Sequence, residues 1–242
     1  MLSSQLKNCE ILIKSGVLQD GIVSGSGSKR ELVRAESRNL ITRLQIGSPE
    51  SKNLAMDSVL SLIQEDDKNV MIAVAQGLVS DGFVVRLVAV LNLGVLGVRI
   101  AAARAVSELS CNTKTRKEIG DLGCIGPLIK MLDGKAVEEK EAASKALSLL
   151  LLYAGNRRIF RKAEGGIVST VQLLDASIQN LDKKYPVSIL ASLVHSNKCR
   201  KQMIAAGASV HLKKLVDMNV EGSKKLLDGL GRGKIWGVFA RH

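Results

Sequence analysis

Apolar residues recur along this chain at spacings that predict a succession of short amphipathic helices. In the segment 125–132 they stand at i, i+3, i+4 and i+7, which is one face of a helix: Ile125, Leu128, Ile129 and Leu132. A polar stretch follows, and 138–152 then predicts a longer helix with the inward positions Ala142, Ala146, Leu149 and Leu150. The small alanines suit a place where two helices approach each other closely.

The same pattern returns at a fixed interval, and a glycine opens each copy. These glycines are 41, 42 and 42 residues apart: Gly82, Gly123, Gly165 and Gly207. Because glycine adopts positive φ without steric cost, each is expected to form a helix C-cap or a sharp turn. A polar break, two or more basic residues, and then Ile or Phe precede the glycine in the later copies.

A unit of this size cannot bury the apolar face of its own helices, whereas stacked copies bury that face against one another. The three prolines of the chain leave long stretches free to be helical. The sequence therefore predicts an all-α superhelix built from repeats.

The motifs that carry this period resemble armadillo repeats. They are the opening G-x-I-x-x-L-I-x-x-L, the long-helix pattern A-x-x-A-L-x-x-L and the closing N-R-R-x-F/I-x-x-x-x-G, found at 123–132, 142–150 and 156–165. The resemblance covers about 38–220 and implies a right-handed alpha-alpha superhelix, an armadillo solenoid, of about four to five repeats. These repeats are expected at about 38–77, 78–122, 123–164, 165–206 and 207–230.

Two further resemblances concern the type of repeat and the closing segment of the chain. HEAT repeats are the nearest alternative, but they lack the glycine and the third short helix. The closing segment 222–242 is similar to the C-terminus of plant armadillo-repeat proteins of the vacuolar-protein-8-like kind. That similarity implies that the chain is the C-terminal part of a longer protein.

The two ends of the chain depart from the repeat period. The segment 1–37 predicts a capping helix followed by a flexible Ser/Gly linker at 24–29. At the other end, the basic and aromatic tail 231–242 is expected to cap the last exposed core face with Trp236 and Phe239. An exposed docking motif or a membrane motif is the alternative for these two aromatics. The break that lets the tail fold back is expected at the glycines Gly229, Gly231 and Gly233.

The composition and net charge of the chain indicate which partners it favours. Apolar residues make up 46 % of the chain and aromatics only 2 %, and the net charge is +12. A basic surface favours anionic partners, although a spread of solvated lysines explains the charge equally well. The four cysteines are far apart and the N-terminus is not a signal peptide, so a reduced, soluble protein of the cytoplasm, the nucleus or both is expected.

The sequence lacks the signatures of catalysis. The stretches "GSGSK" and "GRGK" lack the spacing of a phosphate-binding loop and a preceding strand. The cysteines and histidines do not cluster at metal-ligand spacings. We therefore expect no catalytic residue, no metal and no cofactor.

The armadillo resemblance implies that the long helices line a concave groove. In importin-alpha-like proteins a ladder of Trp and Asn in this groove binds nuclear localisation signals. Here the Trp positions are Ser58, Arg104, Lys145 and Ser188, and the Asn positions are Leu62, Glu108, Leu149 and Ser192. Because neither series matches, binding of a nuclear localisation signal is disfavoured.

Cations stand at two of these groove positions instead. Arg104 and Lys145 are one repeat apart, and together they predict a site that binds an acidic extended peptide, as in beta-catenin-like grooves. Three further cations are expected to widen the patch: Arg86, Arg99 and Lys130. Glu108 partly offsets this charge, and the alternative is that all of these are ordinary solvated groove residues.

The function that follows is a non-catalytic scaffold or adaptor that binds an acidic or extended segment of a partner protein. One alternative is the substrate-recruiting module of a ubiquitin ligase, whose catalytic domain would lie outside this chain. A second is a basic protein that binds an anionic membrane or a nucleic acid. Self-association into a homodimer through an uncapped apolar end is also left open.

Overall fold

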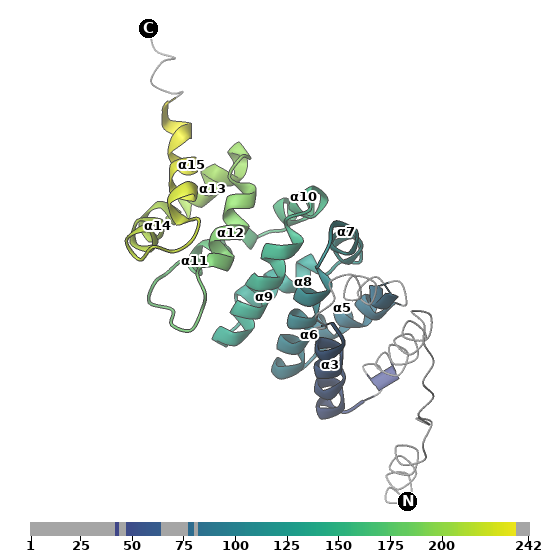
Figure 1. Ribbon diagram of the computed structural model, residues 1–242. Helices are drawn as coiled ribbons and strands as arrows, with labels where there is room; N and C mark the ends of the chain where they lie inside the picture. Colours follow the sequence, from purple (N-terminus) through teal and green to yellow (C-terminus); the bar gives the residue numbers. More distant parts are fainter. Residues whose placement is uncertain (1–41, 44–46, 64–76, 80–81, 236–242) are drawn as a thin grey trace, which may run out of the picture. The chain divides into compact units, whose positions relative to one another are not determined.

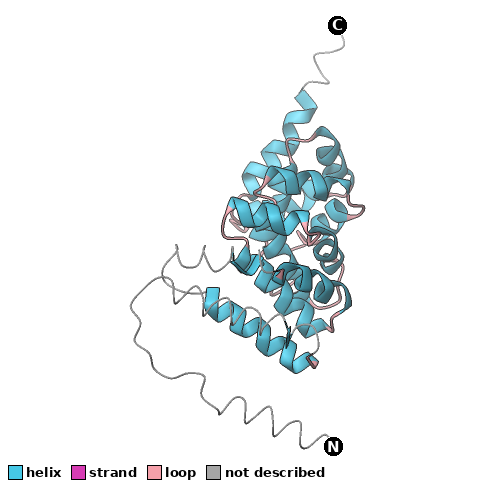
Figure 2. Ribbon diagram, turned by 90° about the vertical axis from the view of Figure 1, so that its right-hand side faces the viewer, coloured by secondary structure: helices cyan, strands magenta, loops and turns pink. Residues whose placement is uncertain are grey.

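The computed structural model describes residues 42–43, 47–63, 77–79 and 82–235 (Figure 1). All of them belong to one compact unit, Arg34–His242. In this described part the regular elements are all helices, joined by short loops (Figure 2). None of these helices is long and apolar enough to cross a membrane.

Three successive units of three helices account for most of the described chain. Each unit has a first, a second and a third helix. In the first unit these are α7 (Thr113–Asp121), α8 (Ile125–Leu132) and α9 (Val137–Leu150). In the second they are α10 (Ala154–Lys162), α11 (Gly166–Gln172) and α12 (Lys184–Leu193). In the third they are α13 (Asn197–Ala205), α14 (Ala208–Asp217) and α15 (Ser223–Ile235). Three helices precede them: α3 (Pro49–Ile63), α5 (Phe83–Leu93) and α6 (Leu96–Leu109).

Equivalent helices pack in parallel rows (Figure 1). The row of third helices runs without interruption through α3, α6, α9, α12 and α15, each in contact with the next. The second helices α5, α8 and α11 form another row, and the first helices α7 and α10 contact each other as well. This stacking buries the faces that one unit leaves open, so the predicted all-α solenoid is confirmed.

The two helices predicted from periodicity are present as α8 and α9. The four apolar residues predicted for the inner face of α8 are all buried. On α9, Ala142, Ala146 and Leu150 are buried, while Leu149 is only partly so. Helical spacing alone was therefore sufficient to place most of the core of this unit.

The repeated glycines adopt the backbone conformation that the sequence predicts. Gly82, Gly123, Gly165 and Gly207 have φ of 81°, 91°, 75° and 85°. Each stands between the first helix of a unit, or its equivalent, and the second helix. The left-handed turn at this point gives every unit the same change of direction.

A buried amide ties the second unit to the first. Asn156 Nδ2 donates to Arg116 O at 2.8 Å and to Leu150 O at 2.9 Å, and the residue is fully buried. Gly120 faces this amide, since a Cβ at that position would lie only 1.9 Å from Asn156 Oδ1. The glycine therefore allows α10 to approach α7 closely.

The prediction that three glycines break the last helix is wrong, because α15 continues to Ile235. Gly229 explains part of this difference. A Cβ there would lie 3.0 Å from Cγ2 of Val194, the residue that directly follows α12. This glycine thus permits a close contact between two helices instead of interrupting one of them. Leu226 and Leu230 on the same helix are buried, as predicted, and Leu227 is half-buried.

The predictions for the two ends of the chain lie outside the described residues. They concern the N-terminal segment 1–37 with its linker at 24–29, and the aromatic residues Trp236 and Phe239 of the tail. The capping role of each end stays a prediction.

Gly123→Ala is expected to lower the free energy of unfolding by about 1–2 kcal/mol, the cost of a Cβ in the left-handed conformation. Apart from the two adjacent residues, none of the described residues has an atom within 4 Å of that Cβ, so the cost is conformational. Gly126→Ala, three residues on and within α8, is the matched control. It also meets no neighbour within 4 Å and is expected to stabilise the helix by up to about 1 kcal/mol. Urea unfolding measures both; effects of the same sign would contradict the assigned turn.

Candidate functional site

A cleft of about 350 Å³ crosses three third helices of the row, α6, α9 and α12. Three of the six residues that the sequence predicts for the groove line this cleft. Polar and charged side chains line most of it: Arg104 and Glu108 from α6, Glu138, Glu141 and Lys145 from α9, and Tyr185 from α12. The remaining lining residue is Ala142.

Helical spacing explains why these side chains converge. On α9 the lining residues stand at 138, 141, 142 and 145, which is the i, i+3, i+4, i+7 pattern of one helix face. The opposite face of α9 carries Ala143, Leu147 and Leu150, all fully buried. On α6, Arg104 and Glu108 are one turn apart. The same packing that buries the apolar faces therefore turns the charged faces toward the cleft.

Charges of both signs occupy the cleft. Lys145 Nζ lies 3.1 Å from Glu108 Oε1, and the two side chains are 41 % and 30 % exposed. Arg104 is exposed one turn before Glu108 on α6. Glu138 and Glu141 add two more carboxylates, so three carboxylates face two cations. The predicted cationic pair is present, but its surroundings do not form a uniformly positive surface.

Tyr185 provides the aromatic ring of the cleft. It lies in the first turn of α12 and is half-buried. The ammonium of Lys184 is 5.0 Å from the centre of its ring and also pairs with Asp182 at 2.7 Å. The hydrogen bond to Asp182 and the charge interactions with Tyr185 and Asp182 raise the pKa of Lys184 above its usual value. These contacts hold a cation at one rim of the cleft.

Arg99, predicted as a groove cation, has a structural role instead. Its guanidinium donates to Glu139 Oε1 from Nε at 2.9 Å and from Nη2 at 2.6 Å, and from Nη1 to Gly94 O at 2.9 Å. The Glu139 side chain is only 4 % exposed. This arginine therefore connects the end of α5, the start of α6 and the start of α9.

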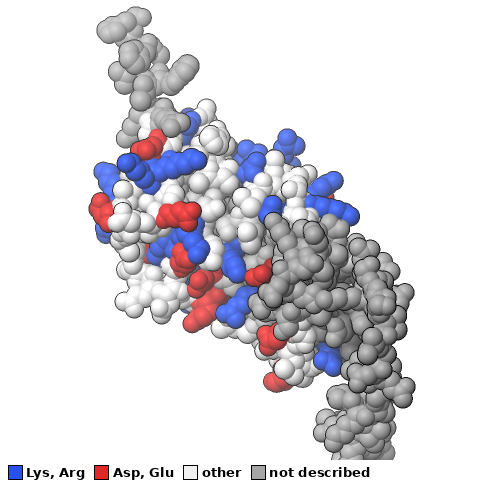
Figure 3. Space-filling model, in the orientation of Figure 1, with Lys and Arg blue, Asp and Glu red and all other residues white. Residues whose placement is uncertain are grey.

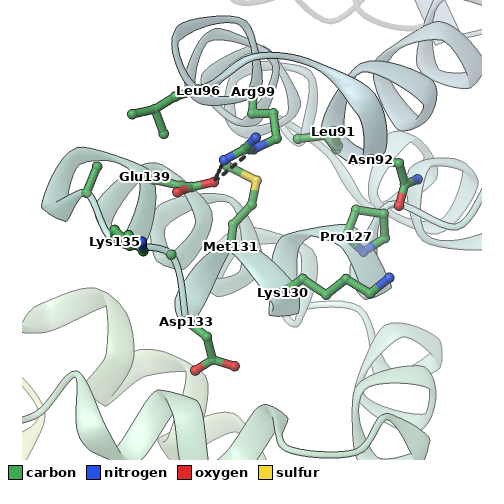
Figure 4. Close-up of a pocket in the computed structure, with 12 residues that line it drawn as sticks. Leu91, Asn92, Leu96, Arg99, Pro127, Lys130, Met131, Asp133, Lys135 and Glu139 are labelled. Atoms are coloured by element: carbon green, nitrogen blue, oxygen red, sulfur yellow. Dashed lines mark hydrogen bonds and ion pairs between the residues drawn. The ribbon is translucent and has the colours of Figure 1, made fainter.

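Arg99 and Glu139 lie in a second cavity, of about 500 Å³ (Figure 4). Lys130 also lines this cavity, with Asp133 and Met131 beside it. Arg86 is exposed on α5 and does not line either of these two cavities of the described chain. Of the six predicted groove residues, the structure brings together only Arg104, Glu108 and Lys145.

Three residues of the cleft were missed by the sequence reasoning. Glu138 lies in the first turn of α9, where a carboxylate also suits the helix N-terminus. The spacing of Glu138 and Glu141 relative to Lys145 was the signal that could have placed both on the groove face. Tyr185 stands one turn before Ser188, a position that the groove ladder had already marked.

The described residues contain no group of three or more His, Cys, Asp or Glu that could hold a metal ion. Among the cysteines of this part, Cys124 and Cys199 are buried and Cys111 is partly buried, and none forms a disulfide. Burial raises the pKa of the Cys124 thiol to about 12. At neutral pH this thiol is protonated, which disfavours it as a nucleophile.

Comparison with known proteins identifies the fold. A designed armadillo repeat protein has a TM-score of 0.57 and 19 % sequence identity, over 86 % of this chain and 94 % of that one. A second, in complex with the peptide (KR)4, has a TM-score of 0.55 and 20 % identity, over 86 % and 95 %. A computationally designed armadillo repeat protein for modular peptide recognition has a TM-score of 0.56 and 19 % identity, over 86 % and 94 %.

This chain has the armadillo-repeat fold. The predicted class of solenoid is thereby confirmed. No family model matches the sequence, and no curated protein is significantly similar to it. The similarity to plant proteins stays a prediction.

Arg99→Ala is expected to lower the free energy of unfolding by about 2–3 kcal/mol, because it leaves a buried carboxylate without its partner. Lys145→Ala is the matched comparison, since it removes the other ion pair between the same two helices. That pair is far more exposed, so a loss below about 1 kcal/mol is expected. Urea unfolding of both variants measures the difference. Equal losses would mean that the two pairs have the same role.

Proposed function

We propose that this protein is a non-catalytic scaffold or adaptor that binds an extended segment of a partner protein in the cleft of α6, α9 and α12. The observation that carries the proposal is that this cleft crosses helices of three successive repeats with polar side chains turned into it. Such a row suits an extended chain, because neighbouring helices are about 10 Å apart and an extended peptide spans that distance in about three residues.

The fold supports this proposal. Among the structural neighbours, one designed armadillo protein is in complex with a peptide and another was designed for modular peptide recognition. Those properties belong to the designed proteins. For this chain they support peptide binding by the row of third helices. The chemistry of the bound segment has to be inferred from the side chains of the present cleft.

The sequence suggests that the bound segment is acidic, and the charges of the cleft change this expectation. Arg104 is exposed, and its guanidinium can bind a carboxylate through two parallel hydrogen bonds. Lys145 is already paired with Glu108. Glu138 and Glu141 would repel a uniformly acidic peptide and attract a basic side chain. We therefore propose a segment of mixed charge, with an acidic residue at Arg104 and a basic residue near the two glutamates.

The (KR)4 peptide of the designed neighbour carries only basic side chains. In the present cleft such a peptide would meet Arg104 at a position where the importin-alpha-like ladder has tryptophan. Like charges across an interface reduce affinity and select against the wrong partner. This supports the expectation that the protein does not bind nuclear localisation signals.

A test starts from random peptides displayed on phage and selected against the full chain. Selected peptides that carry an acidic residue are expected to lose at least about tenfold in affinity for Arg104→Glu, because an ion pair becomes a repulsion. Peptides with a basic residue are expected to lose affinity for Glu141→Lys. Fluorescence anisotropy with synthetic peptides measures both effects.

Lys213→Glu is the control, since it makes the same charge change as Arg104→Glu at an exposed position of α14, outside the cleft. It is expected to bind the selected peptides like the wild-type chain. Peptides that bind Arg104→Glu and Glu141→Lys with unchanged affinity would overturn the proposed site.

A further inference from the structure

The first helices of the units are strongly basic. α10 contains four Lys or Arg and α13 contains three, and neither contains Asp or Glu. α7 contains three Lys or Arg and two acidic residues. In the view of Figure 3, Lys and Arg gather over α7 and α10, with few acidic side chains among them. No part of the proposed peptide cleft lies on these helices.

One cation of each first helix occupies an equivalent outward position. Each first helix has two buried residues one turn apart, which face the core. These pairs are Thr115 and Ile119, Asn156 and Phe160, and Cys199 and Met203. The residue midway between the two members of a pair points away from the core, since it is about 200° around the helix from each. That residue is Lys117, Arg158 or Lys201, and all three are exposed.

Not every basic residue of these helices faces solvent. Arg116 Nε donates to Ser110 O at 2.9 Å, and Arg157 Nη1 donates to Leu151 O at 2.8 Å. Both carbonyls belong to the residue that directly follows the preceding third helix, so these arginines cap its C-terminus. The remaining exposed cations form what we call the basic edge: Lys114, Lys117, Arg158, Arg161, Lys162, Lys198 and Lys201.

Aliphatic side chains are interleaved with the basic edge. Ile159 is 37 % exposed and Ile204 is 39 % exposed. Ile159 lies one turn before Lys162, and Ile204 lies one turn after Lys201, so both stand beside cations of the edge. In contrast, Phe160 is the single aromatic residue of these three helices, and it is buried. The outward positions therefore combine cations with aliphatic chains and offer no stacking ring.

We propose that the basic edge binds the surface of an anionic lipid bilayer. Anionic headgroups attract clustered Lys and Arg, and the interface accepts short aliphatic side chains beside them. α7 and α10 are in contact, so their axes are about 10 Å apart, and the equivalent outward cation recurs on α13 of the third unit. Non-specific single-strand nucleic-acid binding uses aromatic platforms, which this edge lacks. A bilayer is thus the better complement than a nucleic acid.

This surface is separate from the peptide cleft. The basic edge lies on the first helices, whereas the cleft lies on the third helices, and the two share no residue. The protein would therefore hold a partner segment while it is attached to a membrane. The inference does not depend on whether the cleft binds peptide.

Co-sedimentation with vesicles tests this inference. The full chain is expected to bind vesicles of phosphatidylcholine and phosphatidylserine at low salt, to bind less at high salt, and not to bind phosphatidylcholine alone. The variant Lys117→Gln, Arg158→Gln, Lys201→Gln is expected to bind roughly a hundredfold more weakly, at about fivefold for each cation removed. Circular dichroism and urea unfolding confirm that the variant folds.

A matched control removes three exposed cations elsewhere, as Lys213→Gln, Lys214→Gln, Lys225→Gln on α14 and α15. It is expected to bind vesicles within a few-fold of wild type. If it loses as much as the first variant, net charge rather than the basic edge determines binding, and the proposal fails. Absence of wild-type binding to the anionic vesicles at low salt would also overturn it.

A charge-neutral variant separates a bilayer from a nucleic acid. Ile159→Ser with Ile204→Ser keeps every cation of the edge. It is expected to weaken vesicle binding several-fold and to leave any binding to a DNA duplex unchanged. If the Gln variant of the basic edge loses affinity for the duplex while keeping its affinity for vesicles, the edge is a nucleic-acid surface and the bilayer proposal is wrong.

Discussion

Close contact between third helices of successive units is the constraint on which the rest of the structure depends. α6 and α9 contact each other, and each buries alanines along its length, among them Ala102 and Ala105 on α6 and Ala142 and Ala146 on α9. A larger side chain at a buried position of this kind would disturb the packing around it, because interiors are close-packed. The spacing of the charged side chains across the cleft, including Arg104 and Lys145, is set by this contact.

The repeat period places different sets of side chains on separate surfaces of the same unit. The left-handed glycines repeat the same turn between first and second helices, so a residue at a given place in one unit has an equivalent in the next. Lys117, Arg158 and Lys201 illustrate this on the first helices. The third helices instead vary at the groove position occupied by Arg104, Lys145 and Ser188. One surface is thus uniform along the stack, which suits a planar partner, and the other varies, which suits a specific sequence.

The sequence was sufficient for the parts of the structure that depend on local spacing. α8, α9 and the positive φ of the glycines follow from periodicity and from the properties of glycine. The site was harder, because it depends on what packs against each face. The sequence predicts Arg99 as a groove cation, whereas in the structure its guanidinium pairs with Glu139. Gly229 was predicted to break a helix, because the sequence around it does not indicate that Val194 packs against it.

Asn156 has a consequence for the axial alignment of the stack. The amide of Asn156 satisfies one carbonyl from α7 and another from the end of α9, and a shifted α10 would lose both bonds in a dry environment. This polar group thereby contributes to the register of α10 against α7 and α9, and so to the alignment of the residues that these neighbouring repeats present to a partner.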